Sequence, residues 1–126
     1  FESGFHVNME GDKAALRDGS VFEYCKLNDM VIQAWSVLQF GYFKGNFVGN
    51  EKFQQLNQVL NRLALKYGVS PSAIAIAWVL RYPAKMQAVV GTTNPKHLIE
   101  ASQASKVNLT RKEWYEIYIA SGNDLP

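Results

Sequence analysis

Hydrophobic and polar residues recur along the chain with periods that predict helices and strands. The clearest helix is predicted for residues 51–67, where apolar side chains return every three or four positions and Gln, Asn, Arg and Lys fill the other face. Asn50 is its expected N-cap and Gly68 should follow its C-terminus. A second helix should start at Ser70-Pro71 and be buried on several sides, because residues 73–80 are apolar on every face.

Two other apolar segments, residues 31–38 and 86–90, have the nearly continuous apolarity expected of strands buried on both faces. Because helices separate them, we expect the strands to run parallel and to be joined by a right-handed crossover. Three shorter helices are predicted from their capping residues. The first begins at Ser20, which forms a capping box with Glu23, and ends by residue 27, with Phe22 and Cys25 pointing inward. The second begins at Asn94-Pro95 and runs to about residue 105. The third begins at Thr110, which forms a capping box with Glu113, and ends at Gly122.

Two parallel strands alone would leave both edges of their sheet open, and parallel sheets are normally continued and covered. The chain is therefore predicted to be part of a larger α/β sheet or barrel. Residues 1–19 have mixed polarity and are expected to form a loop, which fits a long connection inside a larger structure better than the start of a compact domain.

Composition narrows the possible functions. The chain has 126 residues, of which 48% are hydrophobic, and its formal net charge is +2. This is enough apolar material for one packed core, and without a basic run we expect neither nucleic acid nor a membrane as partner. The longest apolar run, residues 73–80, is too short to span a bilayer. Cys25 is the single cysteine, which predicts a reducing, cytoplasmic location.

The segment after the second predicted strand carries the strongest candidate chemistry. Gly91 allows the backbone to approach a ligand closely, and Thr92 and Thr93 can donate hydroxyl hydrogen bonds to phosphate oxygens. Lys96 and His97 lie in the first turn of the next helix, where a cation and the helix dipole both favour an anion. The pattern predicts a phosphate site, and the alternative is an ordinary connection with polar turn residues.

A second candidate lies at the end of the first predicted strand. Trp35 can stack on a flat ring, while Ser36 and Gln39 can supply hydrogen bonds. The alternative is that Trp35 simply belongs to the core. The glycine-punctuated loop 39–50 either closes over a ligand or is a surface loop held by its aromatic residues.

Taken together and in order, four segments resemble the C-terminal part of the aldo-keto reductases, and most closely the bacterial YdhF-like oxidoreductases. These segments are MVIQAWSVL (30–38), LALKYGVSPSAIAIAWVLRYP (63–83), AVVGTTNPKHLIEA (88–101) and LTRKEWYEI (109–117). The resemblance runs over roughly residues 18–126. It implies the C-terminal portion of a (β/α)8 TIM barrel, with residues 31–38 and 86–90 as the seventh and eighth strands.

The resemblance also implies a cofactor site for NADPH, with NADH possible. By this resemblance, Trp35 would contact the nicotinamide, and Ser36, Leu38 and Gln39 would contact the pyrophosphate. The 2′-phosphate would be held by Gly91, Thr92, Thr93 and His97, and the adenine by Glu100. Two positions depart from the family. His97 stands where an Arg is common, and it is a weaker cation, which leaves the preference for NADPH over NADH open. Ala101 stands where an Asn often also contacts the adenine.

By the same resemblance, the chain is the cofactor-binding part of an NAD(P)H-dependent enzyme that reduces small-molecule carbonyls to alcohols. The family's catalytic Asp, Tyr, Lys and His come from the first half of the barrel, and none of them can be placed in this sequence. We therefore expect no catalytic residue here and no activity of this chain alone. Its expected partner is the N-terminal part of the barrel or a second copy of itself. The alternative is a non-catalytic interaction or cofactor-sensing module.

Overall fold

In a computed structural model the chain is described over residues 20–40 and 44–124, so the predicted loop 1–19 lies outside the described residues. Its elements, in order, are α1 (Ser20–Leu27), β1 (Ile32–Ala34), the 3-10 turn η2 (Glu51–Phe53), α2 (Gln54–Tyr67), α3 (Pro71–Leu80), β2 (Met86–Ala88), α4 (Pro95–Ser102), the 3-10 turn η3 (Gln103–Lys106) and α5 (Arg111–Ala120). The predicted order of helices and strands is confirmed.

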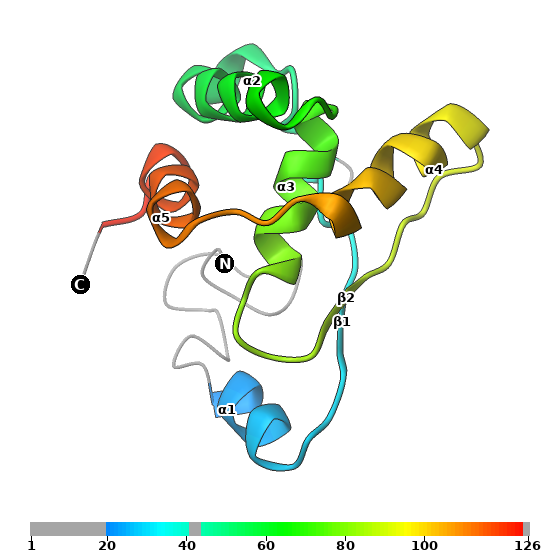
Figure 1. Cartoon of the computed structure of the whole chain (residues 1–126), viewed down its shortest axis with the longest axis vertical. Helices are drawn as coiled ribbons and strands as arrows, with labels where there is room; N and C mark the ends of the chain where they lie inside the picture. The colour runs from blue at the N-terminus through cyan, green and yellow to red at the C-terminus, as the bar shows by residue number, and fades with distance from the viewer. Residues whose placement is uncertain (1–19, 41–43, 125–126) are drawn as a thin grey trace.

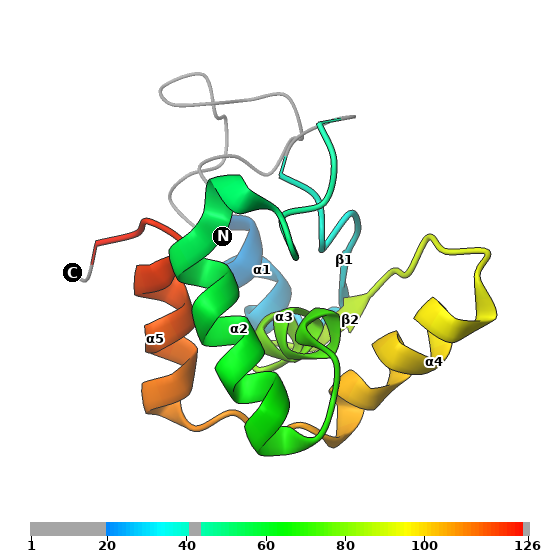
Figure 2. The ribbon, with the colours of Figure 1, turned by 90° about the horizontal axis from the view of Figure 1, so that it is seen from above.

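Helix α3 is the centre of the structure. It contacts α2, α4, η3 and β2, and Figure 1 shows it between these elements. Turned by 90°, the ribbon shows α2 and α5 on one side of α3 and the strand pair on the other (Figure 2). Residues 73–77 are all buried, which confirms the expectation for a helix that is apolar all round. The small alanines among them let neighbouring elements approach closely.

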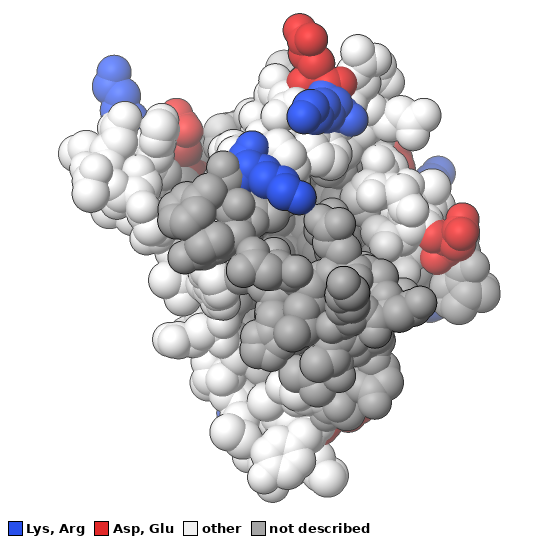
Figure 3. Space-filling view, turned by 180° about the vertical axis from the view of Figure 1, so that it is seen from behind, with Lys and Arg blue, Asp and Glu red and all other residues white. Residues whose placement is uncertain are grey.

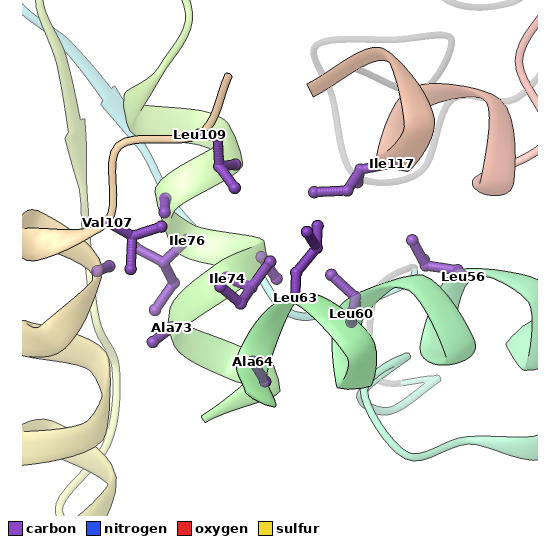
Figure 4. Packing of buried hydrophobic residues seen from close by; sticks show 13 residues of the cluster. Leu56, Leu60, Leu63, Ala64, Ala73, Ile74, Ile76, Val107, Leu109 and Ile117 are labelled. Carbon is purple, nitrogen blue, oxygen red and sulfur yellow. The ribbon is translucent and has the colours of Figure 1, made fainter. Parts of the chain in front are cut away.

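The hydrophobic core lies between α2, α3 and α5. Leu60 and Leu63 of α2 and Ile74 of α3 are fully buried, and Ile117 of α5 points toward the two leucines (Figure 4). The two leucines come from the apolar stripe that predicted α2, so the helical period located this side of the core correctly. The stripe continues through Leu56, which is also buried.

Local capping explains where the helices begin and end. Asn50 Oδ1 accepts a hydrogen bond from the Lys52 amide at 3.0 Å, and Gly68 ends α2 with a φ of 65°. Ser70 and Asn94 cap α3 and α4 as predicted, each followed by proline. Three boundaries differ: residues 51–53 form a 3-10 turn rather than α-helix, α4 ends at Ser102 and continues as the 3-10 turn η3 instead of running as α-helix to about residue 105, and Ser20 is already helical instead of preceding the helix.

Helix α5 is fastened to α2 and α3 by polar contacts. The Trp78 and Trp114 rings stack with centroids 4.8 Å apart, and each indole N–H donates to the backbone carbonyl of the other tryptophan. The predicted capping box of Thr110 and Glu113 is present. Lys66 and Tyr67 of α2 also donate hydrogen bonds to the Glu113 carboxylate, so the first turn of α5 is joined to the last turn of α2.

The two strands pair in parallel, as predicted, with Ile32 opposite Met86 and Ala34 opposite Ala88. They are much shorter than the predicted segments 31–38 and 86–90, and the expectation that both faces are buried is wrong. Val31, next to β1, is 51% exposed, because α3 covers only one side of this narrow pair. A two-stranded sheet has no further strand to order its ends, so pairing stops after three residues.

Helix α1 contacts the segment after α3 through Phe22. Phe22 and Cys25 are half-buried, as their predicted inward positions require, and the Phe22 and Tyr82 ring centroids lie 5.3 Å apart. Over residues 20–40 and 44–124, no single helix is long and apolar enough to cross a membrane. The helical segments 51–67 and 71–80 are long and apolar enough only when they are counted together, and the chain bends by 93° between them.

Candidate functional site

A cavity of about 540 Å³ opens where β1 and β2 end. Its size lies within the range of about 300–1,000 Å³ that is common for small-molecule sites. Residues that follow each strand form two of its walls, and the remaining lining comes from α3, from α4 and from the loop before α2. Five separate segments of the chain therefore meet at the carboxyl ends of two parallel strands.

The first wall is the segment 35–39. Strand β1 ends at Ala34, and Ser36 has a φ of 54°, which turns the chain out of the extended conformation. The Gln39 amide then donates to the Ser36 carbonyl at 2.9 Å and closes a turn. Trp35 lines the cavity and is 53% exposed, so it is not the core residue that the alternative interpretation required. Its ring is accessible for stacking on a ligand.

The second wall follows β2 and contains Gly91 and Thr92. A Cβ atom at Gly91 would meet no other atom within 4 Å, so the backbone there is openly accessible. Thr92 Oγ1 accepts a hydrogen bond from the Asn94 amide at 3.1 Å, and its own hydroxyl hydrogen is left to donate elsewhere. Thr93, one residue further on, is exposed and does not line the cavity.

Helix α4 brings its first turns to the same cavity. His97 and Glu100 are three residues apart, lie on one helix face and both line the cavity. Asn94 Oδ1 accepts from the Lys96 amide at 3.0 Å and so caps the helix N-terminus, whose dipole favours negative charge. Lys96 itself is exposed and does not line the cavity, which separates it from the predicted phosphate site.

The third wall includes residues that sequence reasoning did not identify. Gly45 and Asn46 line the cavity because Asn46 forms an antiparallel bridge with Gln39. Ser72 and Ile76 of α3 also line it. Their spacing of four residues places both on one helix face, and this was the signal in the sequence that could have found them. Asn46, which forms the bridge to Gln39, could not be found from helical spacing, since no periodic pattern marks it.

The loop 39–50 is held by its aromatic residues, as one of its two interpretations expected. The Phe53 ring lies 5.0 Å from the Phe40 ring and 6.4 Å from the Phe47 ring, measured between centroids. Residues 41–43 lie outside the described residues, so closure of this loop over a ligand stays a prediction.

The ionisable groups around the cavity are few. Among the described lining residues these are His97 and Glu100. The described part of the chain contains no cluster of three or more His, Cys, Asp or Glu residues that could hold a metal ion. On the face in Figure 3, two basic side chains lie near each other at the top, beside an acidic one, and the other charged side chains that are described are scattered. The arrangement therefore offers hydroxyls, amides, one imidazole, one carboxylate and one indole to a ligand.

Comparison with known proteins gives one consistent result. A family model described as the aldo/keto reductase family matches residues 14–121. Over 94 residues the chain is 37% identical to the 6-dehydroglucose reductase of Agrobacterium fabrum, a match that covers 73% of this chain and 30% of that protein. It is 30% identical over 95 residues to the oxidoreductase YdhF of Escherichia coli, covering 74% and 30%. The chain thus spans about 30% of the length of these curated relatives.

Solved structures agree. The chain is similar to the thermostable aldo-keto reductase Tm1743, crystallised with the inhibitor epalrestat, with a TM-score of 0.64, 25% identity and coverage of 86% of this chain and 36% of that one. It also resembles MGS-M4, an aldo-keto reductase from a deep-sea metagenome library, with a TM-score of 0.54 and coverage of 97% and 39%. The second match has 16% identity and shows the fold alone.

Proposed function

The chain belongs to the aldo/keto reductase family, a family of oxidoreductases, and from this premise we propose that it is the cofactor-binding part of an NAD(P)H-dependent enzyme that reduces carbonyls to alcohols. The predicted fold class, the C-terminal portion of a (β/α)8 TIM barrel, is confirmed by the similarity to aldo-keto reductase structures. The assignment of β1 and β2 as the seventh and eighth barrel strands is part of the proposal.

One observation carries the proposal. Of the nine residues expected to contact the cofactor, the cavity is lined by all except Thr93; the eight are Trp35, Ser36, Leu38, Gln39, Gly91, Thr92, His97 and Glu100. They come from segments more than fifty residues apart in the sequence. Their meeting place is the carboxyl end of the parallel strands, where TIM-barrel enzymes have their active sites.

The donor groups fit a nicotinamide dinucleotide. The exposed Trp35 indole would stack on the nicotinamide, and Ser36 and Gln39 would donate to the pyrophosphate. Thr92 and His97 lie at the capped N-terminus of α4 and would hold the 2′-phosphate of NADPH. When bound, the cofactor supplies the hydride for carbonyl reduction.

The proton donor for the reduction is proposed to lie outside this chain. Among the described residues, the cavity is lined by no Tyr, Lys or Asp, the side-chain types that the family uses beside a His. Tyr67, which lies beside Lys66, donates to Glu113 at the junction of α2 and α5 instead. We therefore expect this chain alone to bind cofactor without reducing carbonyls.

The partner proposed for this chain is the remainder of the barrel. Several apolar side chains around the strand pair are exposed, namely Val31, Trp35, Val89, Val90, Leu98 and Ile99. In a complete TIM barrel further strands continue the sheet beyond both edges of such a pair and cover its other face. A second copy of the chain is the competing occupant, and sedimentation of the chain with and without the remaining barrel segment distinguishes the two.

The proposal is tested by titrating NADPH and NADH into the chain and following nucleotide fluorescence. Substitutions at two neighbouring residues make the test more specific, because His97 lines the cavity and Lys96 does not. His97→Ala is expected to weaken NADPH binding about tenfold through loss of a hydrogen bond to a charged group, and to affect NADH less. Lys96→Ala should change neither affinity by more than about twofold.

Three outcomes decide between the interpretations. Failure of the wild-type chain to bind either nucleotide would contradict the proposed function. Carbonyl-dependent oxidation of NADPH by this chain alone would contradict the assignment of the proton donor to another part of the barrel. Binding of NADPH without carbonyl reduction even by the full-length protein would favour a cofactor-sensing module.

A further inference from the structure

Asn57 is a buried polar residue that the cavity itself does not use. It lies in the first turn of α2, is only 8% exposed and does not line the cavity. Its Oδ1 atom accepts a hydrogen bond from the Gly49 amide at 2.7 Å. Its Nδ2 atom donates toward the carbonyl oxygens of Phe47 at 2.9 Å, Phe53 at 3.0 Å and Asn50 at 3.1 Å.

Every one of these partners is a backbone group of residues 47–53. A single side chain thus hydrogen-bonds to four backbone groups of the segment that leads from the cavity into α2. The carbonyls of Phe47 and Asn50 also accept backbone hydrogen bonds, from the Asn50 amide at 3.2 Å and the Phe53 amide at 3.0 Å, so Asn57 joins successive turns of this segment. The stripe of α2 that Asn57 adjoins is otherwise apolar, and a buried amide is unfavourable there unless its hydrogen bonds are made. Such fully satisfied buried groups fix one arrangement of the chain around them.

Two hydrogen bonds in series connect Asn57 to the cavity wall. The first joins Asn57 to the Phe47 carbonyl, and the second runs from the Phe47 amide to the Leu38 carbonyl at 3.1 Å. Leu38 and its neighbour Gln39 line the cavity, and Gln39 forms the bridge to Asn46, another lining residue. A displacement of Phe47 caused by a change at Asn57 would therefore move both residues 38–39 and residues 45–46, which form the two sides of this wall.

The aromatic contacts of the same loop cannot replace this connection. Phe40 and Phe47 pack on Phe53, but ring contacts at 5.0 and 6.4 Å are attractive over a range of orientations. Hydrogen bonds are directional and weaken steeply when misaligned, so the amide of Asn57 sets the orientation of the segment that the aromatic rings only hold in place.

We propose that Asn57 is a positioning residue, which fixes the wall formed by residues 38–39 and 45–46 and thereby sets the affinity of the cavity for the nicotinamide nucleotide. This inference rests on the proposed function for the identity of the ligand. It assigns a role in binding to a residue of α2 that has no contact with the cavity.

The test uses Asn57→Asp and a control of the same residue type one turn further along the helix. Asn57→Asp keeps the acceptor for Gly49 but places a carboxylate against three carbonyl oxygens. Asn57→Ala is the second variant, since it buries no charge if the first does not fold. Asn61→Ala is the control, because Asn61 is exposed on α2. For each chain, NADPH binding is titrated and hydrogen exchange is followed by mass spectrometry.

The expected result is that both Asn57 variants bind NADPH about tenfold more weakly, with one site per chain retained, while Asn61→Ala binds like the wild type. Amide exchange should accelerate in peptides covering residues 38–50 and stay unchanged in peptides from α3. A variant that merely destabilised the fold would instead lower the number of sites at unchanged affinity and accelerate exchange in α3 as well, and that result would overturn the inference.

Two further outcomes separate this inference from the proposed function. If the wild type binds NADPH and the folded Asn57 variants bind it equally well, the positioning role is wrong while the proposed function stands. If the wild type binds no nucleotide, the proposed function fails and the affinity claim fails with it. Faster exchange in residues 38–50 of the variants would then still support the fixing of the wall by Asn57, and unchanged exchange would refute that part too.

Discussion

The two halves of the structure on either side of α3 are packed very differently. On the helical side, Leu60 and Leu63 of α2 have no exposed surface. On the strand side, Trp35 is 53% exposed and Leu98 of α4 is 54% exposed. Figure 2 shows the contrast in the ribbon, with α2 and α5 close together on one side of α3 and α4 extending away on the other.

Stability and ligand access are therefore assigned to separate halves of the structure. Apolar area removed from water stabilises a fold at roughly 25 cal/mol per Å², so the helical half supplies most of the favourable free energy of folding. The strand half leaves its hydroxyls, its indole and the α4 N-terminus accessible around the cavity. Substitutions in the first half should therefore change stability most, and those in the second should change it least.

The largest effect is expected for truncation of a buried leucine in α2. Leu60→Ala should lower the free energy of unfolding by about 2–5 kcal/mol, because Leu60 is fully buried and its removal leaves a cavity. Leu65→Ala, on the same helix, is the matched control: Leu65 is 86% exposed and its truncation should change stability by less than about 0.5 kcal/mol. Urea denaturation followed by circular dichroism measures both, and equal losses would contradict the division between the two halves.

A second effect arises where α5 joins α2. Burial raises the pKa of Glu113, but hydrogen bonds from Lys66, from the Thr110 backbone and side chain, and from Tyr67 outweigh it and lower the pKa from 4.5 to about 2. A carboxylate with a lowered pKa stabilises the folded state above its unfolded pKa, and this stabilisation is lost as the pH falls through the folded pKa. Stability should therefore decline between about pH 5 and pH 2.

Glu113→Gln tests this assignment. The variant should be less stable than the wild type by on the order of 2–3 kcal/mol near neutral pH, and the two should converge as the pH falls through about 2, where Glu113 itself becomes protonated. Glu116→Gln is the control, because Glu116 pairs with Arg62 on the surface and exposed pairs contribute about 0–1 kcal/mol. A difference between Glu113→Gln and wild type that stays constant from neutral to acidic pH would show that the charge of Glu113 is not its source.

The helical half could be predicted from the sequence because its information is local. The apolar stripe of α2 and the caps Asn50, Ser70, Asn94 and Thr110 each act within a few residues. Ser70, Asn94 and Thr110 cap the predicted helices, and Asn50 caps the 3-10 turn η2 that leads into α2. The boundary errors at Ser20, at residues 51–53 and at residues 103–105 each amount to a residue or a single turn.

The strand half could not be predicted as well because its structure depends on distant neighbours. The apolar run 31–38 indicated a long buried strand, but Ser36 has a positive φ and β1 ends two residues before it. Nothing in that run marks the turn, since Ser is not a residue that favours a positive φ. The candidate site gathered most of its expected residues, yet Asn46 and Asn57 were missed, because both act through contacts across the loop.

A smaller effect is expected at the start of β1, where buried and exposed side chains are neighbours in sequence. Ile32 is 7% exposed and Val31 is 51% exposed. Ile32→Val should lower the free energy of unfolding by about 0.5–1.5 kcal/mol, whereas Val31→Ala should lower it by less than about 0.5 kcal/mol. If Val31→Ala proved the more damaging of the two in the same denaturation experiment, the outer side of the strand pair would have to be covered in solution.

The smallest change in stability, and the one that ties the strand half to function, is expected at Ser36. With a φ of 54°, Ser36 occupies the left-handed region, which costs a non-glycine residue about 1 kcal/mol, so Ser36→Gly should raise the free energy of unfolding by about 0.5–1 kcal/mol. The same substitution removes a hydroxyl that lines the cavity and should weaken NADPH binding by roughly threefold to tenfold.

Ser36→Ala is the control, because it removes the hydroxyl and keeps the strain, so it should weaken binding without raising stability. Weaker binding by Ser36→Gly than by Ser36→Ala would indicate that the strain is maintained for ligand binding, as strained backbone at functional sites often is. A gain in both would show that the turn at Ser36 serves only to end the strand.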